Sequence, residues 1–168
     1  MDKRYLMLIE ALDGAPRDLA RLVKPLAATD AHWRPAPDEW SIAIVVAHLT
    51  YIEGLLLARF HRIVGTEHPK ERALEPNHAE HVSQADGHTL AELLDLFRAK
   101  RAETTAYLNT LTQPQWLRTC DHQMFGVTRL RKQVEILIGH DNEHLAQIVD
   151  IRNKLEVRTA TRNDNAKS

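Results

Sequence analysis

The spacing of apolar residues is the feature that most limits what this chain can fold into. Over four long segments, apolar side chains recur every three or four residues, and the alternation typical of half-buried strands is almost nowhere present. A period near 3.6 places such side chains on one face of a helix. The sequence therefore predicts four substantial helices, at about residues 3–27, 42–64, 90–111 and 129–155.

Residues typical of helix ends support these boundaries. Ser41 and Thr128 are suited to cap the second and the last helix, and Thr89 with Glu92 forms a capping-box pattern before the third. The first segment contains a glycine and a proline, which predict a break or kink over residues 13–16.

Four helices without competing strands are typical of an all-α protein, and we predict an antiparallel four-helix bundle. The polar segment 66–88, between the second and third helices, is long for a bundle turn and is either a lid over a site or a mobile loop. The bundle domain is expected to occupy residues 1–157. The polar residues 158–168 are expected to form a disordered tail.

Length and charge narrow the classes of function. A chain of 168 residues is long enough for one domain with its own core. The net charge of −1 gives no electrostatic basis for binding nucleic acid or an anionic membrane. We expect no signal peptide and no membrane span, and the single cysteine, Cys120, cannot form an internal disulfide. A cytoplasmic protein that acts on a small molecule is therefore expected.

Three histidines lie within apolar, helix-periodic segments. His140 and His144 are four residues apart, so their imidazoles lie one turn apart on one helical face, and His48 lies among aliphatic residues far upstream. A partly buried imidazole needs a partner for each ring nitrogen, and a metal ion would supply one of the two. The three residues together predict a three-nitrogen metal site with open coordination positions.

The order of these motifs resembles a known family. A Trp-Arg-Pro-Ala-Pro run over residues 33–37, followed by Asp-Glu-Trp-Ser, then His48 in a helix and the run 140–148 near the end, resembles the DinB-like (damage-inducible) superfamily. The resemblance extends over about residues 3–155. It implies a four-helix bundle that binds one divalent metal on His48, His140 and His144. It also implies metal-dependent hydrolases or thiol-dependent S-transferases and isomerases, the bacillithiol and mycothiol enzymes among them, as functional relatives.

Such a site would support two related reactions. A divalent ion on three neutral imidazoles acidifies a bound water toward a pKa of about 7, or holds a thiol as the thiolate. Zinc suits three nitrogens and an open position, and nickel fits by the same ligand chemistry. Glu143 shares a helical face with His140 and His144 and is an acceptor that holds a ligating ring, a catalytic base, or an acid facing water.

We therefore predict a metal-dependent enzyme that activates a thiol or water against a small electrophilic substrate, as an S-transferase or hydrolase. A low-molecular-weight thiol is a candidate second cofactor. The alternative is a non-catalytic metal-binding or ligand-sensing bundle, in which the same histidines mainly stabilise the fold.

Apolar residues around the second helix predict self-association. They exceed what one core face can bury, and relatives in the DinB-like group are often dimers, so a homodimer is expected. The residues are Leu55, Leu56, Leu57 and Phe60.

Other patterns have competing interpretations. The H-x-x-E-H pattern of zinc peptidases also matches His140, Glu143 and His144, but it needs a third ligand downstream, where the chain offers few carboxylates. Each remaining candidate has a functional and a more common structural or solvated interpretation. These are Cys120 with His122 as a thiol and base, His68, His78, His81 and His88 as a second metal cluster, Trp33 and Trp40 as a ligand platform, and Arg34, Arg59 and Arg62 as an anion site.

Overall fold

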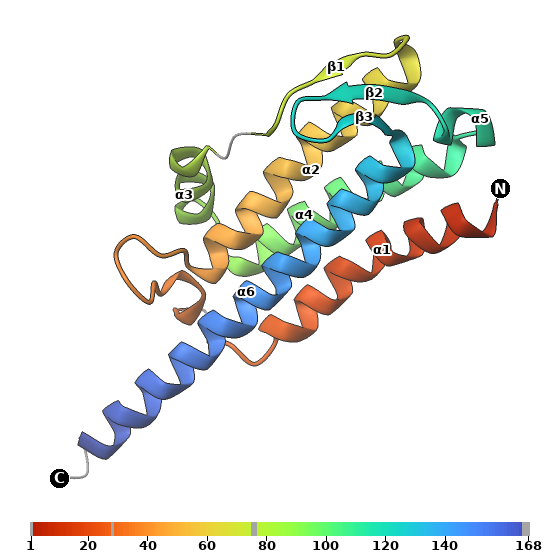
Figure 1. The fold of residues 1–168 in the computed structure, drawn as a ribbon. Helices are drawn as coiled ribbons and strands as arrows, with labels where there is room; N and C mark the ends of the chain where they lie inside the picture. Colours follow the sequence, from red (N-terminus) through yellow and green to blue (C-terminus); the bar gives the residue numbers. More distant parts are fainter. Residues whose placement is uncertain (1, 28, 75–76, 166–168) are drawn as a thin grey trace.

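Four long helices make up most of the molecule (Figure 1). The computed structural model describes residues 2–27, 29–74 and 77–165, and most of these are helical. The long helices are α1 (Lys3–Val23), α2 (Ile42–Gly65), α4 (Leu90–Thr110) and α6 (Leu130–Asn165). The shorter elements are the 3-10 helix η1 (Asp30–His32), β1 (Lys70–Glu71), α3 (His78–Asp86), α5 (Gln113–Trp116), β2 (Thr119–His122) and β3 (Gly126–Arg129).

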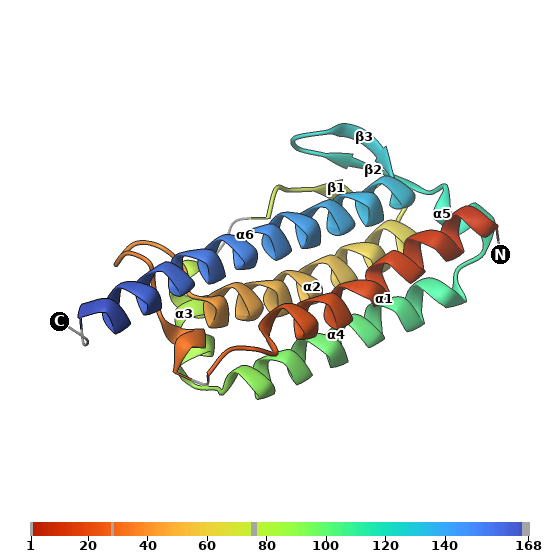
Figure 2. The same cartoon turned by 90° about the horizontal axis from the view of Figure 1, so that it is seen from below.

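Helix α2 is the centre of the packing, and it lies beside both α4 and α6 (Figure 2). Its predicted cap is confirmed, because the Ser41 side chain accepts a hydrogen bond from the Ile44 N–H. Every residue from Ile42 to Leu49 is buried. Contrary to expectation, α2 is long and apolar enough to cross a membrane, but 67% of its most apolar stretch is buried inside the protein, as in a core helix.

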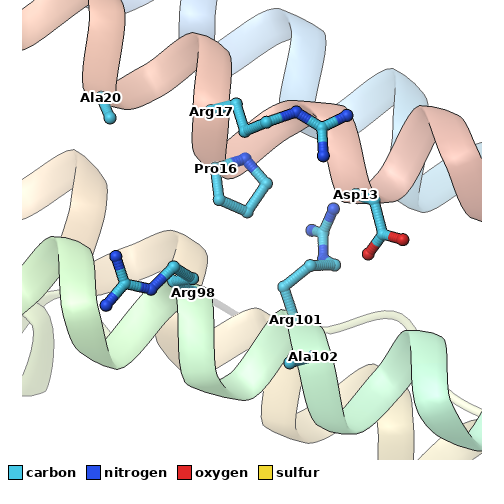
Figure 3. A pocket seen from close by; sticks show the side chains of 7 residues that line it. All are labelled: Asp13, Pro16, Arg17, Ala20, Arg98, Arg101 and Ala102. Carbon is cyan, nitrogen blue, oxygen red and sulfur yellow. The ribbon is translucent and has the colours of Figure 1, made fainter.

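Helix α1 continues through Pro16, where the sequence predicted a break over residues 13–16. Proline has no N–H, so the Leu12 carbonyl four residues earlier lacks its helical donor. The Arg101 guanidinium on α4 donates to that carbonyl at 2.8 Å. Pro16 and Arg101 line the same hollow between α1 and α4 (Figure 3). A donor from the neighbouring helix thus replaces the missing bond and accounts for the unbroken helix.

Arg101 also connects α4 to α2 and α6. It is 1% exposed and donates to both carboxylate oxygens of Asp141, at 2.8 and 3.0 Å, and to Glu53 at 2.7 Å. Burial raises the pKa of Asp141 to about 6, while the neighbouring guanidinium opposes that rise. Because Asp141 directly follows His140, this network fixes α6 at the level of the predicted metal site.

A small sheet lies over one end of α2 and α6 (Figure 1), where the sequence predicted almost no strand. Strand β1 pairs with β2 in parallel, and β2 pairs with β3 in antiparallel orientation. Gly126 begins β3 with a φ of +63°, which glycine adopts without steric cost. Along β2, the buried side chains of Cys120 and His122 alternate with the half-buried side chains of Thr119 and Asp121. Strands this short leave too little alternation to identify from sequence.

Segment 66–88, predicted to be either a lid over a site or a mobile loop, has secondary structure of its own. In its described part it contains β1 and α3. The Asn77 side chain caps α3 by accepting from the Glu80 N–H, and the helix buries His81 and Ala85. Helix α3 packs against α2.

Helix α6 is longer than predicted, because it extends to Asn165 and includes most of the expected disordered tail. Two threonines in this extension donate to carbonyls four residues earlier. The Arg158 guanidinium lies 5.1 Å from the centre of the Trp33 ring, which anchors the extension to the segment before α2.

Candidate metal centre

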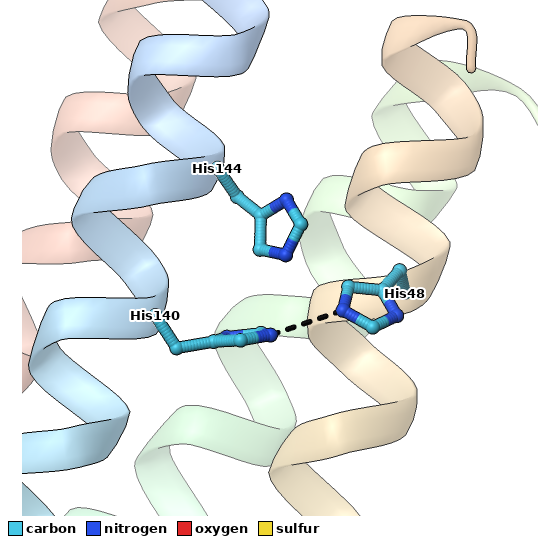
Figure 4. Close-up of side chains that lie close together, drawn as sticks. All are labelled: His48, His140 and His144. Carbon is cyan, nitrogen blue, oxygen red and sulfur yellow. Dashed lines mark hydrogen bonds between the residues drawn. The ribbon is translucent and has the colours of Figure 1, made fainter. Parts of the chain in front are cut away.

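The three predicted histidines converge between α2 and α6 (Figure 4). His48 comes from α2, and His140 and His144 come from consecutive turns of α6. One ring nitrogen from each lies within 4.8 Å of the others, and the Nε2 atoms of His48 and His140 are 3.0 Å apart. Three imidazoles this close can share one cation.

The remaining ring nitrogens are partly held by other side chains. The Nδ1 atom of His48 is 3.1 Å from the Nε2 of His81 on α3, and the Nδ1 of His144 is 2.8 Å from the Gln147 amide oxygen. These contacts orient the Nε2 atoms of both rings toward the cluster. The Nδ1 of His140 is buried and has no hydrogen-bond partner within the part of the chain that the structure describes.

Burial keeps the cluster neutral. It lowers the pKa of His48 to about 3 and that of His140 to about 4, and the neighbouring histidines add to both shifts. Burial also lowers the pKa of His144 and of His81. Neutral imidazoles are the form that binds a metal ion, so these donors fit a first-row divalent ion at neutral pH.

Trp40 packs over the cluster. Its ring centre is 5.0 Å from that of His48 and 6.0 Å from that of His144, on which it stacks at 8°. The indole N–H donates to Nδ1 of His78 on α3 at 3.0 Å. Trp40 is thus a packing residue, as its common interpretation predicted, and it packs directly on the candidate ligands.

A cavity of about 300 Å³ opens beside the histidines. His48 and His140 form one part of its wall, and apolar side chains such as Ile52, Leu56 and Phe125 form much of the rest. The hollow in Figure 3, between α1 and α4, has a similar volume of about 290 Å³ but includes none of the three histidines. The cavity between α2 and α6 is therefore the one positioned for chemistry at the cluster.

Glu143, the predicted catalytic residue, is exposed on α6. Its negative charge tends to raise the pKa of His144, against the stronger effect of burial. The H-x-x-E-H alternative gains little support, because Glu156 downstream is 70% exposed and pairs with Arg152 on the same helix. The catalytic role of Glu143 stays a prediction.

Sequence reasoning missed two features of the site. His81 was expected to be solvated, or to belong to a second metal cluster, but it is fully buried against His48. The signal was present, because Asn77 is suited to cap a helix that places His78 and His81 on one face. Arg59, for which a solvated helix face was the more common interpretation and an anion site the alternative, is 3% exposed and lines the cavity.

Comparisons with known proteins identify the family and the fold. A model of the DinB superfamily matches residues 11–148. The chain belongs to the DinB superfamily. YuaE, an uncharacterized protein of Bacillus subtilis, is 24% identical to this chain over 149 residues. The match covers 80% of this chain and 90% of YuaE.

Solved structures show the same fold. YfiT from Bacillus subtilis, described as a probable metal-dependent hydrolase with an unusual four-helix bundle topology, matches with a TM-score of 0.74 and 21% identity over 93% of this chain and 90% of YfiT. A conserved protein from Enterococcus faecalis matches with a TM-score of 0.68 and 18% identity, over 92% of this chain and 98% of that protein. A mycothiol-dependent maleylpyruvate isomerase matches at 0.64 and 14% identity, over 90% of this chain and 63% of the isomerase.

Proposed function

We propose that this DinB superfamily member is a metal-dependent enzyme that activates a thiol or water against a small electrophilic substrate, as an S-transferase or hydrolase. The observation that carries the proposal is the convergence of three histidines, His48 buried and His140 and His144 half-buried, beside a largely apolar cavity. A site that only stabilised the fold would need no cavity next to its ligands. The cavity therefore favours an enzyme over a structural metal site.

In this proposal each residue of the centre has a defined task. His48, His140 and His144 would hold one divalent ion, with zinc and nickel as the first candidates. The bound ion would supply a nucleophile at neutral pH, either a hydroxide from water or a thiolate. His81 and Gln147 would fix the rings of His48 and His144, and Trp40 would exclude water from the side that it covers.

The names of the relatives support both versions of the reaction. YfiT is described as a probable metal-dependent hydrolase, and the more distant isomerase as mycothiol-dependent. We favour the thiol version, because Glu143 is exposed and is not positioned as a secure base for water.

Three finer features belong to the same proposal. The four long helices form an antiparallel bundle, the protein is cytoplasmic, and it is a homodimer. The residues first used to predict the homodimer give it little support, because Leu56 and Phe60 are buried within the chain and Leu55 and Leu57 are half-buried. The proposal of a homodimer therefore depends on the resemblance to DinB-like relatives.

Paired turnover assays test the reaction. Metal-loaded protein is offered an epoxide or halogenated electrophile, and separately an activated ester, each with and without a small thiol. We expect electrophile turnover only when the thiol is present, and loss of that turnover in His48→Ala. The matched control is His32→Ala, which removes an exposed histidine of η1 and should leave turnover unchanged.

Thiol-independent ester turnover that rises near pH 7 would favour the water version instead. Turnover that persists in metal-free His48→Ala would contradict both versions.

A further inference from the structure

Two stripes of side chains face each other along the seam between α2 and α6, and most of them line the cavity. The side chains on α2 are four, four and three residues apart along the chain, and those on α6 are three, four and four residues apart. Each set therefore lies on one face of its helix. His48 contacts His140, and Arg59 donates to Gln133 at 3.2 Å, so the two helices run in opposite directions along this seam. The stripes are His48, Ile52, Leu56 and Arg59 on α2, and Gln133, Ile136, His140 and His144 on α6.

The cavity therefore has two chemically different ends. His48 and Arg59 are eleven residues apart on one helix, which places their Cα atoms about 16 Å apart at about 1.5 Å per residue. Apolar side chains separate them, from α2, α6 and the turn between β2 and β3. The histidine end is the proposed metal centre. The Arg59 end is not assigned by that proposal.

The Arg59 end has more hydrogen-bond donors than acceptors. Arg59 donates to Glu71, Gln133 and the Arg72 carbonyl. His122 also lines the cavity, and it meets two donors, the Arg59 Nη1 at its Nε2 and the Met124 N–H at its Nδ1, both at 3.2 Å. A neutral imidazole has one lone pair, so it accepts only one of these bonds. The other ring nitrogen carries a hydrogen, so this N–H and the donor that faces it both lack an acceptor there and are left for a ligand.

The charged side chain that lines this end of the cavity is the guanidinium of Arg59. Glu71 accepts from both Arg59 and Arg62, so two guanidinium groups share one buried carboxylate. Glu71 is not part of the cavity wall, whereas Arg59 is. Arg62 is 52% exposed and outside the cavity. A buried positive charge with a spare donor favours an anionic group on the ligand.

We propose that this cavity binds a small organic anion with an apolar chain, with its anionic group against Arg59 and His122 and its other end at the histidine cluster. This assignment rests on the proposed function, because it names the substrate class for the same cavity. The apolar middle selects an extended carbon chain. The two ends set its length and orientation.

The test measures ligand binding to metal-free protein, with octanoate as the probe and 1-octanol as its uncharged counterpart. Isothermal titration of the wild type should show about tenfold or greater preference for octanoate, the range of one hydrogen bond to a charged group. Arg59→Met should abolish the preference. Because that change leaves Glu71 with one partner, the double variant Arg59→Met with Glu71→Met removes the whole buried pair and should also bind both probes equally.

Arg62→Gln is the matched control, since it removes the other arginine bound to Glu71 but leaves the cavity wall intact. It should keep the preference for octanoate. Equal binding of the two probes by the wild type, or a preference retained in the folded double variant, would overturn the proposal. Since no metal is present, failure here is distinct from failure of the thiol or water chemistry.

Discussion

Each histidine of the cluster has one ring nitrogen that faces away from the other two rings. The hydrogen-bond partner of that nitrogen determines how rigidly the ring is held. His48 depends on His81, which α3 places at 3.1 Å from its Nδ1. If Nε2 of His48 binds a metal ion, Nδ1 keeps its proton and donates a hydrogen bond to Nε2 of His81. In the proposed centre His81 would therefore position His48, and α3, a short helix in a segment expected to be a lid or loop, would contribute to the site.

Replacing His81 should weaken metal binding without removing a ligand. We expect His81→Ala to lower the affinity by about tenfold to a hundredfold, the usual effect of removing a hydrogen-bond partner from a metal-ligating histidine. His81→Gln retains an acceptor and should recover part of the loss. Competition with a chromophoric chelator measures both. Equal affinities in wild type and His81→Ala would show that His81 does not position His48.

The lowered pKa values of the cluster make stability depend on pH. His48 titrates at about 3 and His140 at about 4 in the folded protein, below the ordinary value of 6.5. The unfolded chain therefore binds protons first, so the contribution of these histidines to the stability of metal-free protein is fully present above pH 6.5 and is lost progressively as the pH falls toward 3. Thermal unfolding from pH 7 to pH 4 should show this loss.

The comparison with His48→Gln isolates the histidine contribution. Asp141, with a pKa raised to about 6, titrates in the same range with the opposite sign, and it is present in both proteins. The variant should lose less stability than the wild type between pH 7 and pH 4. Identical slopes would mean that His48 is not held neutral by burial.

At the scale of helices, the buried Arg101 network links the four long segments. Arg101 on α4 reaches the Leu12 carbonyl on α1, Glu53 on α2 and Asp141 on α6. Removing one member of such a network leaves buried charges without partners, which costs more than the network itself contributes.

Arg101→Met should therefore lower the free energy of unfolding by about 3–5 kcal/mol, the range for breaking a buried ion pair. Arg98→Met, on the same helix, removes an arginine that pairs with Asp95 at the surface, and should change stability by less than about 1 kcal/mol. Urea unfolding compares the two. A loss in Arg101→Met no larger than in the control would show that the network does not hold the helices together.

Elements with strong local signals could be predicted from sequence, and those that depend on distant partners could not. The Ser41 cap and the Thr89–Glu92 capping box are local, and the structure has both. The continuation of α1 past Pro16 depends on Arg101, which is 85 residues away and gives no local signal. Strand β1 depends in the same way on pairing with β2.

At the scale of the whole molecule, one seam between α2 and α6 contains everything that the proposed activity needs. The three histidines converge there, and the cavity extends from them toward Arg59. The i, i+4 spacing predicted the pair on α6, His48 in another apolar helical segment was predicted as the third ligand, and the family resemblance implied the same three residues. The buried positions of His81 and Arg59 required the fold, because sequence alone could not show what covers a polar side chain.

Metal content tests the central claim most directly. Protein purified without a metal-binding tag is analysed by elemental mass spectrometry, for the wild type, for His140→Ala and His144→Ala, and for the exposed-histidine control His32→Ala. We expect about one divalent ion per chain in the wild type and the control, and loss of most of it in the other two, because two remaining ligands form only a weak chelate. Equal metal content in all four proteins would contradict the assignment of the three histidines as the metal centre.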